Sequence, residues 1–176
     1  MNDENNCNYR DSVEKPLPGD NLNAKIGVLI RRETEARILA PLIDGLAQAF
    51  GKDAVLSVLK NTIEKIARQQ GKELSRQMGG NSLKHFVESL KYWTMDDALE
   101  IDVIEESEYE LSFDVRRCRY AELYESLGIR ELGTIFSCTR DFALIEGFNC
   151  DVTLTRSQTI MEGAPCCDFR YRLNRL

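Results

Sequence analysis

The sequence predicts an α+β domain in which N-terminal helices pack on one face of an antiparallel sheet built from two β-hairpins. Between residues 26 and 92, apolar side chains recur every three or four positions, which is typical of amphipathic helices. Over residues 99–116, and again from residue 152, apolar and polar residues alternate as in strands with one buried face. Helices and strands therefore occupy separate blocks of the chain, and this grouping favours α+β.

The chain is expected to begin with an irregular leader, residues 1–23, and to continue as one domain, residues 24–176. The leader is rich in Asn and Asp and contains two prolines and a glycine, which disfavour regular structure. The first helix is expected over residues 26–50. Pro41 is expected to kink it or to divide it in two, because proline lacks the N–H that the helix needs.

Two further helices are expected before the first strand. Asp53 is expected to cap a helix over residues 54–78, because an Asp side chain accepts hydrogen bonds from the free N–H groups of a first turn. Two glycines then end it. Ser82 is expected to cap a short helix, residues 83–92, which carries His85, the one histidine of the chain.

Helical spacing returns over residues 119–146, with breaks expected at Gly128 and Gly133. The second hairpin is expected over residues 152–173, with Ile160 belonging to its first strand. A Glu-Gly-Ala-Pro turn joins its two strands.

The composition excludes several classes of partner. A net charge of −6 and the absence of a basic stripe argue against nucleic acid and anionic membranes. No apolar run reaches about 18 residues, so no transmembrane helix is expected. The first residues are polar and acidic, unlike a signal peptide, and this predicts a cytoplasmic protein.

Six cysteines in such a chain are expected to be free thiols, with disulfide pairing as the ordinary alternative. None of them forms a Cys-x-x-Cys pair, which disfavours a zinc ribbon.

The last strand brings sulfur, a carboxylate and a guanidinium close together. Because alternate residues of a strand share a face, Cys167 is expected to face the helices, whereas Cys166, Asp168 and Arg170 face away from them. Asp168 and Arg170 are candidate substrate-binding residues, Arg170 through a bidentate contact with a carboxylate. The ordinary role of Arg170 would be to pair across the sheet with an acid such as Asp114.

Cys118 is expected where the second strand ends and a helix begins. Unpaired N–H groups at a helix N-terminus favour the thiolate, and Arg116, Arg117 and Arg119 add positive charge, so a lowered thiol pKa is predicted. A structural cysteine among solvated arginines is an equally weighted alternative.

Cys138 and Asp141 are three residues apart, which on a helix places both on one face. They are candidates for an acid–base pair or for two metal ligands, while the ordinary alternative is that Asp141 caps a helix and Cys138 lies in the core. His85 would have to serve any Cys-His or Ser-His pair, but on a short polar helix it is more often a surface residue.

Four segments, taken in their order along the chain, resemble the L-2-amino-thiazoline-4-carboxylate hydrolase family. They are Gly-Val-Leu-Ile-Arg-Arg-Glu-Thr-Glu-Ala-Arg (27–37), Arg-Cys-Arg-Tyr-Ala-Glu (117–122), Ser-Cys-Thr-Arg-Asp (137–141) and Gly-Ala-Pro-Cys-Cys-Asp-Phe-Arg (163–170). The resemblance covers roughly residues 26–173.

This resemblance implies a hydrolase that opens a cyclic amidine, converting L-2-amino-thiazoline-4-carboxylate into N-carbamoyl-L-cysteine. It places the family's cysteines at Cys118, Cys138 and Cys167, and its acid at Asp141. One thiol would act as a covalent nucleophile, or Asp141 would activate the nucleophile or hold the amidinium. His85 completes the set of candidate catalytic residues.

No obligatory cofactor is expected. The alternative is zinc bound by Cys118, Cys138 and Cys167, with one position open for water.

The main rival hypothesis is a non-catalytic small-molecule binding domain of the vinyl-reductase type, whose outline is similar. It predicts an apolar pocket where the three thiols do not converge, whereas the hydrolase hypothesis predicts that at least two of them meet Asp141 in one pocket. The expected partner is a small-molecule substrate, and a homo-oligomer paired through residues 54–78 is left open.

Overall fold

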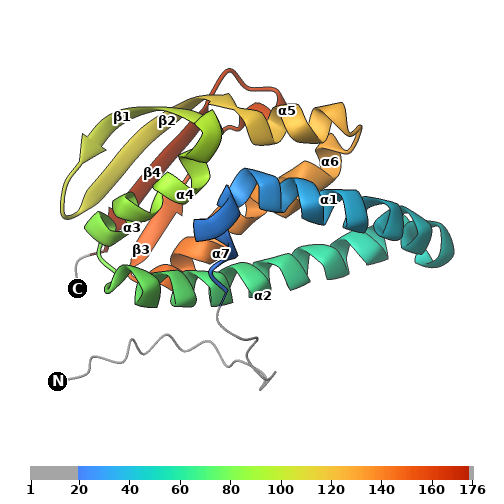
Figure 1. Cartoon of the computed structure of the whole chain (residues 1–176), viewed down its shortest axis with the longest axis horizontal. Coiled ribbons are helices and arrows are strands. Elements are labelled where there is room, and N and C mark those ends of the chain that lie inside the picture. The colour runs from blue at the N-terminus through green and yellow to red at the C-terminus, as the bar shows by residue number, and fades with distance from the viewer. Residues whose placement is uncertain (1–19, 175–176) are drawn as a thin grey trace.

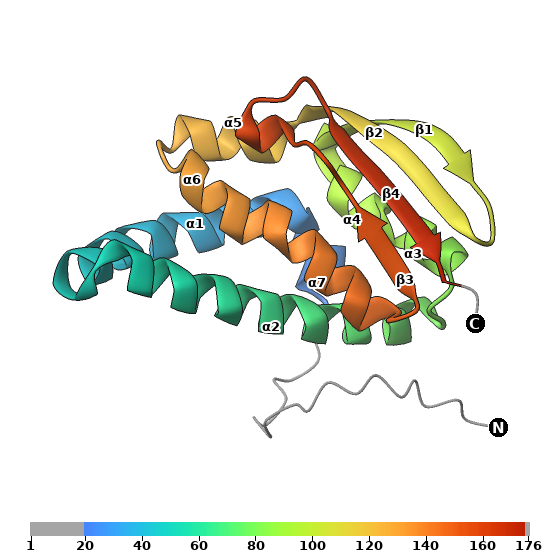
Figure 2. The ribbon, with the colours of Figure 1, turned by 180° about the vertical axis from the view of Figure 1, so that it is seen from behind.

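The computed structural model describes residues 20–174, which form a four-stranded antiparallel sheet with helices on one face (Figures 1 and 2). The strand order is β1-β2-β4-β3. The strands are β1 (Leu99–Glu106), β2 (Glu110–Cys118), β3 (Val152–Thr155) and β4 (Cys167–Leu173). The sheet therefore consists of two hairpins joined through β2 and β4, which confirms the α+β prediction.

The first hairpin lies where it was predicted, but Val103 of β1 is exposed and not on a buried face, since the strand pairing is irregular after this residue. The second hairpin is shorter than predicted. On β2, Leu111, Phe113 and Val115 are buried under the helices. Ile160 does not extend β3, because the chain leaves the sheet after Thr155 and forms a short 3₁₀ turn, η3 (Ile160–Glu162), before β4.

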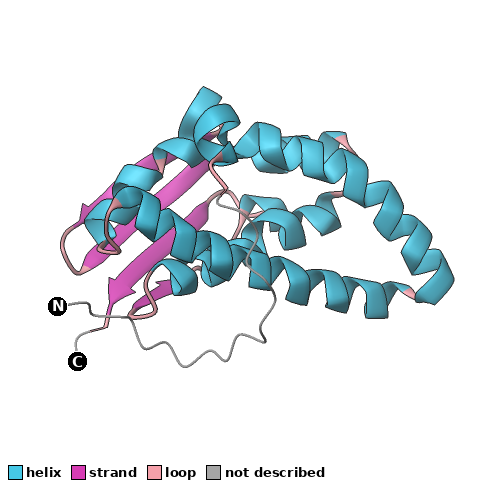
Figure 3. Ribbon diagram, turned by 60° about the horizontal axis from the view of Figure 1, so that its bottom comes forward, coloured by secondary structure: helices cyan, strands magenta, loops and turns pink. Residues whose placement is uncertain are grey.

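Two long helices, α1 (Leu22–Phe50) and α2 (Lys52–Met78), lie antiparallel, and their connecting end extends beyond the sheet (Figure 3). Most of the predicted leader, residues 1–19, lies outside the described residues. The backbone of α1 stays helical through Pro41, so of the two expected outcomes, a kink or a division of the helix, the division does not occur. Proline frees the carbonyl of Arg37, which is an exposed residue, so water can satisfy it. The non-helical residue is instead Gly27, with φ of 72°.

The capping predictions hold in part. Gly51, not Asp53, is the N-cap of α2, and Asp53 lies in the first turn. Ser82 does cap α3 (Leu83–Ser89) by accepting the His85 N–H. A separate turn, α4 (Lys91–Thr94), and a 3₁₀ turn, η1 (Met95–Asp97), then lead to β1.

The second helical block contains one break rather than two. After α5 (Arg119–Ser126), the chain turns at Gly128, where φ is 70°. From there α6 (Arg130–Gly133), one π-helical turn, η2 (Thr134–Cys138), and α7 (Thr139–Phe148) follow without interruption, so Gly133 does not end a helix. Such π turns occur frequently at functional sites.

Glycine allows α2 and α7 to cross at backbone contact. A Cβ on Gly71 would lie 2.1 Å from the Leu144 carbonyl oxygen, and one on Gly147 would lie 2.0 Å from that of Arg68. Helix α7, which carries Arg140 and Asp141 in its first turn directly after Cys138, is thereby held between α2 and the sheet. No helix among residues 20–174 has the length and apolar character needed to cross a bilayer.

Candidate functional site

A small inner cavity lies between the sheet and the helices, and its volume is about 100 Å³. Cys118, Cys138, Asp141 and Cys167 all contribute to its wall. The rest of the wall is mostly apolar and includes the rings of Phe86, Trp93, Phe113, Phe169 and Tyr171. A cavity of this size suits a small ligand, since pockets for drug-sized molecules are several times larger.

Each of the four residues reaches the cavity from a different place in the fold. Cys118 ends β2 and begins α5, while Cys138 closes the π turn before α7. Asp141 lies in the first turn of α7 and is not its cap. Cys167 begins β4, on the face that also carries Phe169 and Tyr171 into the cavity, as strand alternation predicted.

Asp141 is paired with Arg156, which follows β3. Arg156 Nη1 lies 2.5 Å from Asp141 Oδ2, and Arg156 Nη2 donates to the Cys138 carbonyl oxygen at 2.9 Å. The guanidinium also lies over two rings, 5.1 Å from the Phe142 centroid and 4.9 Å from that of Phe169. Its side chain is only 5% exposed, so its position is set by these contacts.

Burial raises the pKa of Asp141 above that of an ordinary aspartate, although the charges of Arg156, Arg140 and Arg32 act in the opposite direction. The carboxyl group therefore binds a proton more readily than a solvated one. A group of this kind can take up and release a proton within one reaction.

The three thiols are held in their neutral form. Burial raises the pKa of Cys118 to about 11, and it also raises the pKa of Cys138 and of Cys167. The prediction of a lowered pKa at Cys118 is therefore wrong. Backbone N–H groups of Ala121 and Tyr120 do favour its thiolate, but desolvation outweighs them.

The neighbouring arginines do not compensate for that desolvation, because their charges are used elsewhere. Arg116 pairs with Asp102, Arg117 pairs with Glu122, and Arg119 donates to the Asp96 carbonyl oxygen.

Two further arginines, Arg32 and Arg140, also line the inner cavity, together with Gln70. Arg32 comes from α1 and Arg140 from α7. Sequence reasoning missed all three residues as candidates. The signal was present in the Cys-Thr-Arg-Asp segment and in the paired arginines of the first helix, but arginines of helices are usually solvated.

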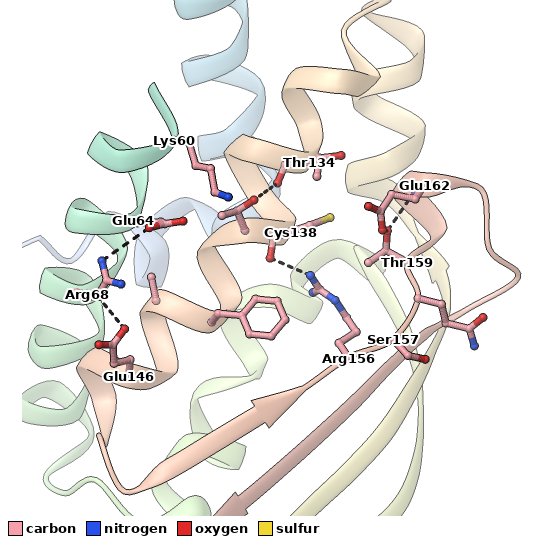
Figure 4. Close-up of a pocket in the computed structure, with 14 residues that line it drawn as sticks. Lys60, Glu64, Arg68, Thr134, Cys138, Glu146, Arg156, Ser157, Thr159 and Glu162 are labelled. Atoms are coloured by element: carbon pink, nitrogen blue, oxygen red, sulfur yellow. Dashed lines mark hydrogen bonds and ion pairs between the residues drawn. The ribbon is translucent and has the colours of Figure 1, made fainter. Parts of the chain in front are cut away.

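A larger outer pocket of about 480 Å³ opens on the other side of Cys138 and Arg156 (Figure 4). These two residues line both the pocket and the inner cavity. In Figure 4 the Arg156 side chain points toward the turn that carries Cys138. The outer pocket is more polar, with Lys60, Glu64 and Glu162 on its walls.

His85, Asp168 and Arg170 line neither hollow. His85 Nδ1 lies 2.7 Å from Ser82 Oγ at the start of α3. Asp168 accepts hydrogen bonds from the backbone N–H groups of Ser157 and Gln158, and so holds the segment that follows Arg156.

Arg170 pairs with Asp114 at 2.8 Å, the cross-strand role that was its alternative, and also donates to two backbone carbonyls.

The remaining cysteines differ from one another. Cys166 is free and buried beside Gln158, whose Nε2 lies 3.2 Å from its sulfur. Cys150 is disulfide-bonded, so the prediction of free thiols throughout is wrong for this residue. Cys7 lies outside the described residues.

The described residues include three thiols of the type that binds zinc, but these thiols are not placed as one ligand group. Within residues 20–174, no three Cys, His, Asp or Glu side chains are placed to hold one metal ion. The three thiols share a cavity wall without forming a ligand group as placed, so zinc stays an alternative to be measured.

Among solved structures, the chain is similar to a trafficking protein particle complex subunit 3 from Naegleria fowleri covalently bound to palmitic acid. The identity is 16%, the match covers 83% of this chain and 96% of that one, and the TM-score is 0.49. It is also similar to the phenol-responsive sensory domain of the transcription activator PoxR with phenol. There the identity is 8%, the coverage is 91% and 78%, and the TM-score is 0.46. Scores at this level support no argument about function.

No curated protein sequence matches the chain. The family model of the L-2-amino-thiazoline-4-carboxylic acid hydrolases matches residues 31–171, which include every residue placed above in the wall of the inner cavity. By this match the chain belongs to the L-2-amino-thiazoline-4-carboxylic acid hydrolase family.

Proposed function

We propose that this protein is a hydrolase that opens a small cyclic amidine in the inner cavity, with L-2-amino-thiazoline-4-carboxylate as substrate and N-carbamoyl-L-cysteine as product. One observation carries the proposal. Cys118, Cys138 and Cys167 come from distant segments, and all three line one cavity with Asp141. The family match supports the hydrolase assignment.

The proposed reaction needs one base that becomes an acid. Water attacks the amidine carbon between the ring sulfur and nitrogen, and Asp141 accepts the proton that the water loses. The bond between this carbon and the ring sulfur then breaks, and protonated Asp141 returns the proton to the departing sulfur. As the carbon–sulfur bond breaks, the hydroxyl left by the water becomes the carbamoyl carbonyl, and its proton passes to solvent, which balances the proton that the substrate's amidinium carried. The products are the carbamoyl group and the free thiol of N-carbamoyl-cysteine, and relative to the neutral amidine the sum is the addition of one water.

The environment of Asp141 suits both halves of this cycle. Burial raises its pKa, which brings the carboxylate closer to the proton affinity of an efficient general base. The charge of Arg156 favours the ionised carboxylate against the effect of burial, and its hydrogen bond fixes the orientation of the carboxylate. The cationic amidinium of the substrate would provide a second positive partner on the cavity side.

The thiols are proposed to act mainly as neutral groups. With pKa values raised by burial, they carry little thiolate at neutral pH, which disfavours covalent attack by sulfur. As soft, weakly polar walls they suit a ring that contains sulfur. A cysteine nucleophile is the alternative mechanism, and the variants described below distinguish it from attack by water.

The test is to incubate the purified protein with L-2-amino-thiazoline-4-carboxylate, follow the products by mass spectrometry, and measure the metal content of the same sample. We expect the substrate to gain the mass of one water. Asp141→Asn is expected to abolish turnover. Cys118→Ala, Cys138→Ala and Cys167→Ala are expected to reduce turnover without abolishing it.

His85→Ala serves as the matched control, because His85 lies outside both hollows, and it should leave the rate unchanged. Complete loss in a single cysteine variant, with an enzyme adduct on the same cysteine in the wild type, would replace the water mechanism by covalent catalysis. Intact substrate, with and without added zinc, would contradict the proposed function.

The second candidate is a binding domain without catalysis, and the mostly apolar wall of the inner cavity favours it. This hypothesis predicts that the same molecule, or a smaller apolar one, raises the melting temperature and is recovered unchanged. Product formation and recovery of the unchanged ligand are measured on one sample, so a single experiment decides between the hydrolase and the binding domain.

A further inference from the structure

We propose that Arg32 and Arg140 form an anion subsite inside the inner cavity, which binds the carboxylate of a small ligand whose cationic end faces Asp141. The identity of the ligand rests on the proposed function, but the subsite itself is argued from the two arginines alone. It would make the cavity selective for small molecules that carry a carboxylate near a basic amidine or amine.

Both side chains are deeply buried. Arg32 is 4% exposed and Arg140 is 5% exposed, and both line the same cavity as Asp141. Burying a guanidinium is costly unless its charge and its hydrogen bonds are compensated. The hydrogen-bond and ion-pair partners of Arg32 and Arg140 therefore indicate whether the two residues have a structural role or bind a ligand.

The described partners satisfy only a small part of the two guanidinium groups. Each has five N–H donors. Among residues 20–174, Arg140 donates one side-chain hydrogen bond, to the neutral amide oxygen of Gln70. Arg32 donates one, to Glu35.

Glu35 is not reserved for Arg32, because it also accepts a hydrogen bond of 2.9 Å from Arg31. Arg31 reaches Asp20 as well, at 2.6 Å. The remaining arginine at the cavity, Arg156, is paired with Asp141. Four guanidinium groups thus meet three carboxylates, and Arg140 is the one that makes no ion pair with any of them.

The electrostatics of Arg140 agree with this imbalance. Burial and, after it, the charge of Arg32 lower the pKa of Arg140 to about 9, although the charge of Glu35 acts in the opposite direction. A bound carboxylate would offset both effects, since it would supply a negative charge and acceptors for the unused N–H groups.

The arrangement also orients a ligand. Arg140 and Asp141 are consecutive residues of α7 and both line the inner cavity, so its wall carries a positive and a negative group. The positive charges of Arg140 and Arg32 lower the pKa of Asp141 against the effect of burial, so the three groups act on one another across this cavity. A ligand with its carboxylate on Arg140 would present a neighbouring cationic carbon to Asp141.

The experiment uses thiazolidine-4-carboxylate as a carboxylate probe and its methyl ester as a neutral probe, with binding measured by calorimetry on the full chain. We expect the wild type to bind the carboxylate at least about tenfold more tightly than the ester, because loss of a buried charge partner removes a bidentate contact. Arg140→Gln should abolish that preference, and Arg140→Lys should restore part of it.

Arg37→Gln is the matched control, because Arg37 lies on the exposed side of α1 and, within residues 20–174, forms an ion pair only with Glu33. It should retain the full preference. A subsite also predicts that Arg140→Gln keeps or raises the melting temperature without ligand, because it removes a buried cation that makes no ion pair among the described residues. A purely structural arginine predicts a lower melting temperature and an unchanged ratio between the probes.

The two proposals fail separately. If the thiazoline carboxylate is hydrolysed and Arg140→Gln changes neither KM nor kcat, the subsite is wrong while the proposed function stands. If nothing is hydrolysed but the wild type prefers the carboxylate probe and Arg140→Gln does not, the subsite stands without the reaction. Equal binding of both probes to the wild type would overturn the subsite in either case.

Discussion

Arg156 Nη1 donates to Asp141 Oδ2 at 2.5 Å, and this pair joins the segment after β3 to the first turn of α7. The same guanidinium lies over the rings of Phe142 and Phe169, and its carboxylate partner lines the inner cavity. One side chain therefore controls both the orientation of Asp141 and part of the wall between the two hollows.

Replacing Arg156 should move the pH dependence of catalysis. Arg156 lowers the pKa of Asp141 against the effect of burial, so Arg156→Met should raise that pKa further. Because Asp141 must be ionised to accept a proton from water, the acidic limb of kcat/KM should move to higher pH. A pH–rate profile measures this shift.

Arg156→Lys keeps the positive charge but lacks the paired N–H donors of the guanidinium. It should therefore move the acidic limb of kcat/KM less than Arg156→Met does. If Arg156→Met leaves the acidic limb in place while the enzyme still turns over, Asp141 is not the group that titrates in catalysis.

The ionisation of Asp141 should lower the free energy of unfolding as the pH rises. Its pKa in the folded protein is above the ordinary value of 3.8, so between these two values the folded state binds more protons than the unfolded state. The stabilising contribution is present below the unfolded pKa and is lost as the pH rises through the folded one. Asp141→Asn removes this loss.

Urea unfolding at several pH values measures the effect. The free energy of unfolding of Asp141→Asn, relative to the wild type, should increase from pH 4 upward and level off above the folded pKa. A difference that stays constant with pH would mean that Asp141 is not perturbed by burial.

The cavity thiols should react slowly at neutral pH. Burial raises the pKa of Cys118 to about 11, so its alkylation by iodoacetamide should accelerate about tenfold per pH unit from pH 7 to pH 10, as the thiolate fraction grows. Intact-protein and peptide mass spectrometry separates the sites, and Cys118→Ala identifies the Cys118 signal. Fast labelling at pH 7 that levels off by pH 8 would instead reveal an activated thiolate and favour the cysteine nucleophile.

The close crossing of α2 and α7 should not accommodate a side chain at Gly71 or at Gly147. Gly71→Ala would place a methyl group 2.1 Å from the Leu144 carbonyl oxygen, and Gly147→Ala would place one 2.0 Å from that of Arg68. Neither contact is sustainable, so the helices must separate, with an expected loss of about 1–3 kcal/mol or more in the free energy of unfolding.

Gly45→Ala provides the control, because a Cβ there meets nothing within 4 Å and the residue is exposed on α1. It should stabilise the protein by about 0.5–1 kcal/mol, because alanine has the higher helix propensity. Chemical denaturation of the three variants tests this, and equal effects at Gly45 and Gly71 would contradict the close crossing.

The sequence by itself determined the layers of this fold. Helical spacing, strand alternation and glycine stops follow from local stereochemistry, and so the two hairpins, the helical blocks and the inward direction of Cys167 could all be predicted. The spacing of Cys138 and Asp141 likewise placed both on one face of a helix. Local pattern was less informative at two residues. The helix continues through Pro41 because water can satisfy the carbonyl that the proline frees, and it continues past Gly133 into a π turn.

Only the tertiary structure decided what the charged residues do. Whether an arginine is solvated, paired or buried depends on what packs against it from distant segments. Arg170 therefore became a structural partner of Asp114, while Arg156 came to Asp141, and Arg32 and Arg140 came to the cavity wall. The same reason explains Cys118, whose helix N-terminus favours a thiolate locally, while its burial by the rest of the chain raises its pKa.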